Sequence, residues 1–183
     1  AAKVRWSEMR SATEAAYDRT SACTFTAFPS YEYTNTENIS NLHRNVIFKN
    51  NIVPDRPVTY YEAPTPPALW RQLASQCKDA GTGCDVLVIP HNSNLSNGQL
   101  FLPDISQSLS ADQSNAQLRA RMEPLVEVFQ HKGDSECRNG FDDVLAEEDP
   151  LCSFEKLRPV GDTQCGEEGG EGGMRLWGCS HRL

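Results

Sequence analysis

The sequence lacks long apolar runs and clusters of basic residues. Its longest apolar stretches, near residues 85–90 and 124–129, are far shorter than the roughly 20 residues that a helix needs to cross a bilayer. Lysine and arginine form no stripe, and a net charge of −8 disfavours a partner with a phosphate backbone. We therefore expect neither a membrane span nor a nucleic-acid partner.

Cys-x-x-Cys pairs, which are typical of structural zinc sites, are also missing, although the chain contains seven cysteines. Seven is a large number for 183 residues in a reducing cytosol, so we predict disulfides and a periplasmic or secreted location. Sequence alone permits several pairings. Local pairing is the simplest, leaving Cys23 over and joining Cys77 to Cys84, Cys137 to Cys152 and Cys165 to Cys179.

Strand and helix patterns follow one another along the chain. Apolar or aromatic residues recur every three to four positions in residues 3–18, which predicts a first helix. Residues 23–34 are β-branched and aromatic and predict a strand that Pro29 interrupts. The other predicted elements are strands at 43–48, 86–89 and 125–129 and helices at 65–78, with Thr65 as the N-cap, and at 111–122.

Helical patterns between short apolar strands are typical of a parallel sheet with crossover helices, hence of an α/β fold. The length and a hydrophobic content of 38% suit a single folded domain. We therefore expect one α/β domain over residues 1–183 with mainly parallel strands. Its segment 133–183 should be rich in loops and held together by disulfides.

His91 is the first candidate functional residue. The apolar strand at 86–89 stops at Pro90, so His91 enters a polar loop at the edge of the sheet, where loops decide what binds. Glu32 lies at the end of another predicted strand, and His43 begins the next one. Three hard or borderline ligands on separate segments suit Zn, Mn or Fe better than a zinc knuckle, whose ligands lie close in sequence.

Each of these residues also has a plainer interpretation. His91 is compatible with a hydrogen bond inside an Asn- and Ser-rich turn, and His43 with a strand-edge position. Glu32 is compatible with an ion pair to Arg44. A further polar pair, His131 and Glu136, follows the strand predicted at 125–129 and either lines the site or forms a turn.

Four segments carry a family resemblance. They are Phe-Pro-Ser-Tyr-Glu-Tyr-Thr (28–34), Asn-Leu-His-Arg-Asn-Val-Ile-Phe (41–48), Ile-Pro-His-Asn-Ser-Asn-Leu-Ser-Asn-Gly (89–98) and Glu-Pro-Leu-Val-Glu-Val-Phe-Gln-His-Lys-Gly-Asp-Ser-Glu-Cys (123–137). They resemble a bacterial, mostly exported family catalogued as a domain of unknown function. That family in turn resembles the polymerase-and-histidinol-phosphatase (PHP) superfamily of metal-dependent phosphoesterases.

The resemblance implies a distorted, TIM-like β/α barrel with a metal cluster. Glu32, His43 and His91 match metal ligands of that superfamily. The chemistry that the resemblance implies is metal-assisted hydrolysis of a small-molecule substrate of the phosphoester class. In that reading Glu32 bridges two cations and acts with His91 at the catalytic centre.

The superfamily's His-x-His pair, Asp-His element and final Asp-x-His element do not occur here. We therefore interpret the chain as an internal piece of a larger enzyme, a partial barrel with part of the divalent transition-metal site. Such a piece should be inactive alone. An incomplete set of ligands binds the metal ion more weakly and does not hold it in the coordination geometry that catalysis needs. Half a barrel also leaves a strand edge open, so we expect self-association through that edge.

The alternative function is an extracellular binding or structural domain stabilised by disulfides, in which the histidines are incidental. An acidic composition and the cysteine spacing fit both functions. Only the hydrolase predicts stoichiometric transition metal in the full-length protein.

Overall fold

The computed structural model describes residues 2–36, 40–93, 96, 99–102, 108–131 and 150–151. The chain divides into two compact units. The first unit comprises residues 1–34, 44–89 and 108–125, and the second comprises residues 35–43, 90–107 and 126–183. The described helices belong to the first unit, and so does the described sheet apart from its last residue, Pro90.

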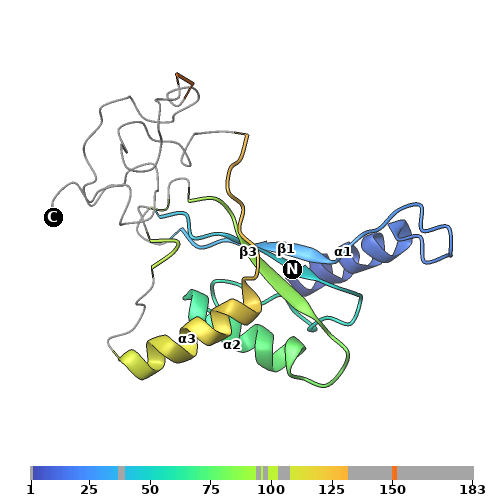
Figure 1. The fold of residues 1–183 in the computed structure, drawn as a ribbon. Helices are drawn as coiled ribbons and strands as arrows, with labels where there is room; N and C mark the ends of the chain where they lie inside the picture. Colours follow the sequence, from blue (N-terminus) through green and yellow to red (C-terminus); the bar gives the residue numbers. More distant parts are fainter. Residues whose placement is uncertain are drawn as a thin grey trace. The chain divides into compact units, whose positions relative to one another are not determined.

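Three strands form an open sheet in the order β1–β2–β3 (Figure 1). β1 (Ser30–Tyr33) runs antiparallel to β2 (Arg44–Phe48), with Tyr31 opposite Val46. Burial alternates along β2, so one face of the strand is packed and the other carries exposed or half-exposed residues. Such alternation is typical of a sheet with one covered face.

β3 (Val86–Pro90) runs antiparallel to β2 as well. The N–H of Lys49, just after β2, donates to the carbonyl of Asp85, just before β3, at 3.0 Å. The N–H of His91, just after β3, donates to the carbonyl of His43, just before β2, at 3.4 Å. The start of each strand therefore lies opposite the end of the other, which is the antiparallel arrangement.

The expected partial, distorted β/α barrel with mainly parallel strands is wrong for the described part of the chain. The parallel arrangement was expected because helical patterns lie between the short apolar strands. In the structure Val86, Val88 and Pro90 are buried, whereas Leu87 and Ile89 are only half buried. A short apolar run is compatible with either environment and does not specify the direction of the strand.

The helix predicted at 65–78 is confirmed. α2 (Pro66–Leu73) begins after Thr65, whose side chain accepts the N–H of Ala68 at 3.4 Å. This bond satisfies one of the free N–H groups of the first turn, and the proline at the helix start has no N–H to satisfy. The helix continues into the π-helical turn η2 (Ala74–Lys78).

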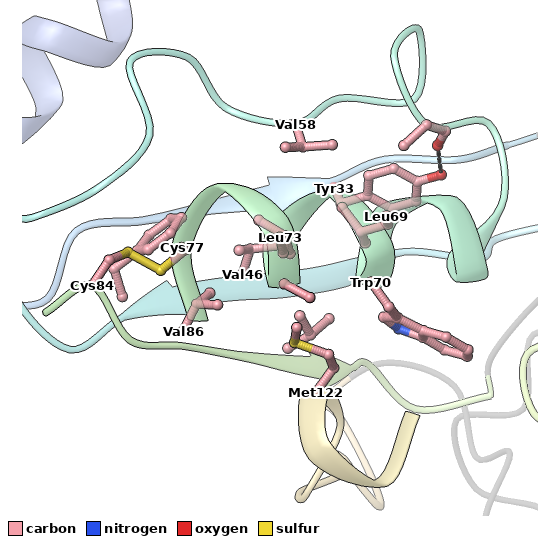
Figure 2. Close-up of a cluster of buried hydrophobic side chains, with 14 of the residues drawn as sticks. Tyr33, Val46, Val58, Leu69, Trp70, Leu73, Cys77, Cys84, Val86 and Met122 are labelled. Atoms are coloured by element: carbon pink, nitrogen blue, oxygen red, sulfur yellow. Dashed lines mark hydrogen bonds between the residues drawn. A yellow bond between two sulfur atoms is a disulfide. The ribbon is translucent and has the colours of Figure 1, made fainter. Parts of the chain in front are cut away.

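The core lies between α2 and the packed face of the sheet. Figure 2 shows Leu69 and Leu73 of α2 beside Tyr33 and Val46 of the sheet. The hydroxyl of Tyr33 donates to the carbonyl of Ala63, which satisfies the polar end of a buried ring. The buried apolar residues of this core are Trp6, Tyr33, Val46, Phe48, Val58, Ala63, Leu69, Trp70, Leu73, Ala74, Cys77, Cys84, Val86, Val88 and Met122.

α1 (Ala2–Ala16) is attached to the core mainly through one aromatic residue. Trp6 is 4% exposed, and its indole N–H donates to the carbonyl of Pro54 at 2.8 Å. Its ring meets Tyr31 and Phe48 edge-on, with centroids 5.6 and 5.8 Å away. Most other residues of the helix are exposed or half exposed, so Trp6 carries most of the attachment.

α3 (Leu109–Met122) confirms the last predicted helix and packs beside α2 (Figure 1). Its final residue, Met122, is fully buried in the core. In the part of the chain that the structure describes, none of the helices combines the length and apolar character that crossing a bilayer requires.

Two predicted strands differ in the structure. Residues 23–29 contain no strand, and pairing begins only after Pro29. Cys23 has a φ of 45°, which is outside the extended region. Residues 125–129 also contain no strand. β-branched and aromatic residues favour an extended chain, but a strand also needs a neighbour that pairs along its length.

The structure confirms the disulfide between Cys77 and Cys84, which joins η2 to the segment before β3 (Figure 2). Gly81 and Gly83 between them have φ values of 68° and 86°, a left-handed conformation that glycine adopts without strain. Cys23 carries a free, exposed thiol, as predicted. The other four cysteines, Cys137, Cys152, Cys165 and Cys179, lie outside the described residues, as does nearly all of segment 133–183.

Candidate functional site

His43 and His91 lie side by side in the second unit. Their ring centroids are 5.1 Å apart and their planes meet at 88°, and a backbone hydrogen bond joins the two residues. Residues that face each other across an antiparallel pair project to the same side of the sheet. Strand pairing therefore brings together two of the three candidate ligands, although they are far apart in sequence.

The surroundings of the His91 ring favour one tautomer. Its Nδ1 atom is in hydrogen-bond contact with the carbonyl oxygen of Asn92. Because a carbonyl oxygen only accepts, this contact favours the neutral tautomer with the proton on Nδ1, which leaves a lone pair on Nε2. Histidines that bind metals commonly donate one ring N–H to a carbonyl or carboxylate in this way. The arrangement thus suits Nε2 of His91 as a metal ligand.

Glu127 contacts the backbone on both sides of His91. Its N–H donates to the carbonyl of Pro90 at 3.1 Å, and its carboxylate accepts the N–H of Asn92 at 2.9 Å. Sequence reasoning missed this residue. The available signal was an acidic residue in the middle of an otherwise apolar segment, residues 125–129.

Buried polar side chains gather in the second unit. Among the described residues, four of the five buried polar or charged residues belong to it, namely Asn35, Ser40, Asn92 and Ser96. Within this described part, the hydroxyl of Ser96 has no hydrogen-bond partner. Burying polar groups is costly unless they are bonded, so a polar interior is more typical of a binding region than of a core.

Glu32 belongs to the first unit, whereas His43 and His91 belong to the second. It is an exposed residue of β1, opposite Asn45 of β2. Convergence of Glu32 with the two histidines therefore stays a prediction. Arg44, the alternative partner considered for Glu32, forms an ion pair with Glu123.

The ion pair of Arg44 and Glu123 is buried in the first unit. Arg44 Nε donates to Oε1 of Glu123 at 2.7 Å, and the indole N–H of Trp70 donates to the same oxygen at 2.8 Å. Nε of Arg119 donates to Oε2 at 3.0 Å. Three donors around one carboxylate offset the loss of its hydration. The cluster fixes the start of β2, the position immediately after His43.

His131 is exposed at the end of the described segment 108–131, and Glu136 lies outside the described residues. Across the ranges that the structure describes, no group of three or more His, Cys, Asp or Glu side chains is placed to hold a metal ion. The two imidazoles alone supply two donors. A complete metal site needs further ligands.

Comparison with known protein families gives a match. The family described as a protein of unknown function, DUF3604, matches residues 1–171. Comparisons with curated proteins and with solved structures give no match. Because the family match spans most of the sequence, the chain belongs to the DUF3604 family.

Proposed function

We propose that this chain supplies two histidine ligands to the metal centre of a metal-dependent hydrolase. The observation that carries the proposal is the pairing of His43 with His91, whose ring centroids are 5.1 Å apart. The contact of Nδ1 of His91 with Asn92 supports it, because the proton on Nδ1 leaves Nε2 available to a cation. The buried polar side chains among the described residues of the second unit support it further.

A divalent Zn, Mn or Fe ion at this centre would supply Lewis acidity toward the substrate. His43 and His91 would hold the ion, and Glu32 would provide a carboxylate ligand. Resemblance of the family to the PHP superfamily supports a phosphoester as the substrate class. The disulfide between Cys77 and Cys84 supports a periplasmic or secreted location, because disulfides persist in oxidising compartments.

Metal analysis of the full-length natural protein tests the proposal. We expect stoichiometric transition metal in the wild-type protein and a clear loss in His43→Ala and in His91→Ala. Asn45→Ala is the matched control, because Asn45 is an exposed residue of β2 close to His43. A wild-type protein without stoichiometric metal, or histidine variants that keep it, would contradict the proposal and favour a binding or structural domain.

The role of Glu32 needs a separate experiment. Glu32→Gln keeps the size of the side chain and removes its charge, so we expect weaker metal binding in the folded full-length protein. Hydrolysis of phosphomonoesters and phosphodiesters with added Mn²⁺ or Zn²⁺ then tests the substrate class. If the metal-loaded protein hydrolyses neither phosphomonoesters nor phosphodiesters, the proposed substrate class is wrong, even if metal analysis has confirmed the metal site.

A further inference from the structure

We propose that Glu127 is a positioning residue that fixes the direction in which His91 presents its Nε2 atom. The inference deepens the function proposed above and rests on it for its metal-binding consequence. The backbone bonds on either side of His91, the burial of that backbone and the contact of the ring with Asn92 support this role.

Two peptide groups flank the Cα atom of His91. The first contains the carbonyl of Pro90, which accepts the N–H of Glu127 at 3.1 Å. The second contains the N–H of Asn92, which donates to the carboxylate of Glu127 at 2.9 Å. One residue therefore holds both peptide groups whose orientations define φ and ψ of His91. The third backbone bond, from the His91 N–H to His43, is longer, at 3.4 Å.

Burial makes the carboxylate bond hard to replace. Asn92 is 1% exposed, so water has little access to its surroundings if the carboxylate is removed. A buried N–H without an acceptor is unfavourable, and the local backbone would have to move to find another one. Glu127 is itself half buried, whereas its neighbours Val126 and Val128 are exposed. The side chain of Glu127 is thus directed inward in a segment that is otherwise open to solvent.

The ring of His91 depends on the same peptide groups. Nδ1 contacts the carbonyl of Asn92, the next residue in the chain, so the contact depends on the local backbone conformation. A backbone released at the Asn92 N–H would lose that contact, and the ring would then populate both neutral tautomers. Glu127 acts through the backbone and does not need to touch a metal or a substrate.

Imidazole ¹H–¹⁵N spectra of the full chain without metal test the positioning directly, because they distinguish the two neutral tautomers. We expect His91 to carry its proton on Nδ1 in the wild-type protein and to show mixed tautomers in Glu127→Ala. Glu127→Gln should restore the wild-type signal, since its amide oxygen accepts the same N–H. Val128→Ala, a change at an exposed position of the same segment, should leave the signal unchanged.

A folded Glu127→Ala protein with the wild-type tautomer would overturn the inference. Should Glu127→Ala fail to fold, Glu127→Asp replaces it, because a shorter carboxylate keeps the charge but does not reach the N–H of Asn92. A folded Glu127→Asp protein with an unchanged His91 tautomer would overturn the inference equally.

Zinc titration of the full-length protein separates this inference from the proposed function. We expect Glu127→Ala to weaken Zn²⁺ binding about 10- to 100-fold, as the loss of residues that orient metal ligands does, and Glu127→Gln to bind near the wild-type level. If the wild-type protein binds no Zn²⁺ while Glu127→Ala still changes the tautomer, the proposed function fails and the positioning role stands. An unchanged affinity in Glu127→Ala would contradict the metal-binding consequence.

Discussion

Arg44 and Glu123 form an ion pair in which each side chain is only 2% exposed, although one residue begins β2 and the other follows α3. The carboxylate also accepts hydrogen bonds from Trp70 and Arg119. A sheet strand and two helices therefore meet at one charged group. Removing that group leaves buried donors without their acceptor. The uncompensated charge of Arg44 would then destabilise the folded protein.

We expect Glu123→Ala to lower the free energy of unfolding by about 3–5 kcal/mol, the usual effect of removing one partner of a buried pair. Glu123→Gln should have a smaller effect, because Arg44 and Trp70 bind the same carboxylate oxygen and an amide oxygen accepts both bonds. Denaturant unfolding monitored by circular dichroism measures both. Glu8→Ala, which removes an exposed pair with Arg5, is the control and should change stability by less than about 1 kcal/mol.

Trp6→Ala should detach α1 from the core. We expect a loss of about 3–5 kcal/mol, as for other buried aromatic residues replaced by alanine. Trp6→Phe should lose less stability than Trp6→Ala, because it keeps an aromatic ring in the core. Some loss remains, because the carbonyl of Pro54 no longer accepts the indole N–H. Val4→Ala, at an exposed position of the same helix, is the control. Hydrogen exchange of α1 that is unchanged in Trp6→Ala would show that other contacts hold the helix.

The loop after α1 should respond to acid through Asp18. Hydrogen bonds from the hydroxyls of Thr20 and Thr24, and from their N–H groups, hold the pKa of Asp18 well below its usual value of 3.8. A lowered pKa in the folded chain contributes stability above the usual value, and this contribution is lost as the pH falls toward the folded pKa. We therefore expect the stability advantage of wild type over Asp18→Asn to shrink below about pH 4.

An NMR titration of the Asp18 carboxyl carbon checks the cause. Thr20→Val and Thr24→Val should each raise the pKa of Asp18, because each removes a hydroxyl that donates to the ionised form. A wild-type Asp18 that titrates at the usual carboxylate pKa would contradict the prediction.

The disulfide between Cys77 and Cys84 should stabilise the turn before β3. Closing so short a loop contributes about 2 kcal/mol in the chain-entropy estimate, so the double variant Cys77→Ala/Cys84→Ala should lose about that much. Cys23→Ala, at an exposed free thiol, is the control and should leave the unfolding midpoint unchanged. A double variant as stable as wild type would show that packing alone holds the turn.

Self-association, expected from the sequence through an open strand edge, stays a prediction, and the structure offers a different surface for it that sedimentation can test. Four apolar residues are exposed in segment 125–129, and the protein would bury them by pairing with a second copy. We expect the sedimentation coefficient of the chain to rise with concentration, and Val128→Glu/Phe129→Glu to suppress the rise. A monomer at all concentrations would instead show that these side chains remain in water.

Sequence patterns predicted the elements whose signals are local. Thr65 followed by two prolines marks the start of α2, and the spacing of Cys77 and Cys84 suggests their pairing. These signals depend on residues that are neighbours in the chain. The direction of β3 has no such signal, since the same apolar run fits a parallel or an antiparallel neighbour. The prediction of a partial barrel with mainly parallel strands is therefore wrong.

The residues of the candidate site also differ in whether a local sequence signal predicts them. His43 and His91 were predicted because each lies at the end of a strand, and strand pairing places them together. Glu127 was missed because its role depends on the backbone of Asn92, which is 35 positions earlier in the chain. A residue that acts through another segment's peptide groups has no motif of its own.

The short loop closed by Cys77 and Cys84 has a consequence for chain cleavage. A protease that cuts one peptide bond between these two residues would leave the halves covalently joined, so the nicked protein would migrate as one species until a reductant separates it into two. Gly81 and Gly83 are exposed there, and an added side chain at Gly81 would meet no atom within 4 Å. The backbone can thus be opened at this turn, for a nick or for new termini, while α2 and β3 stay linked.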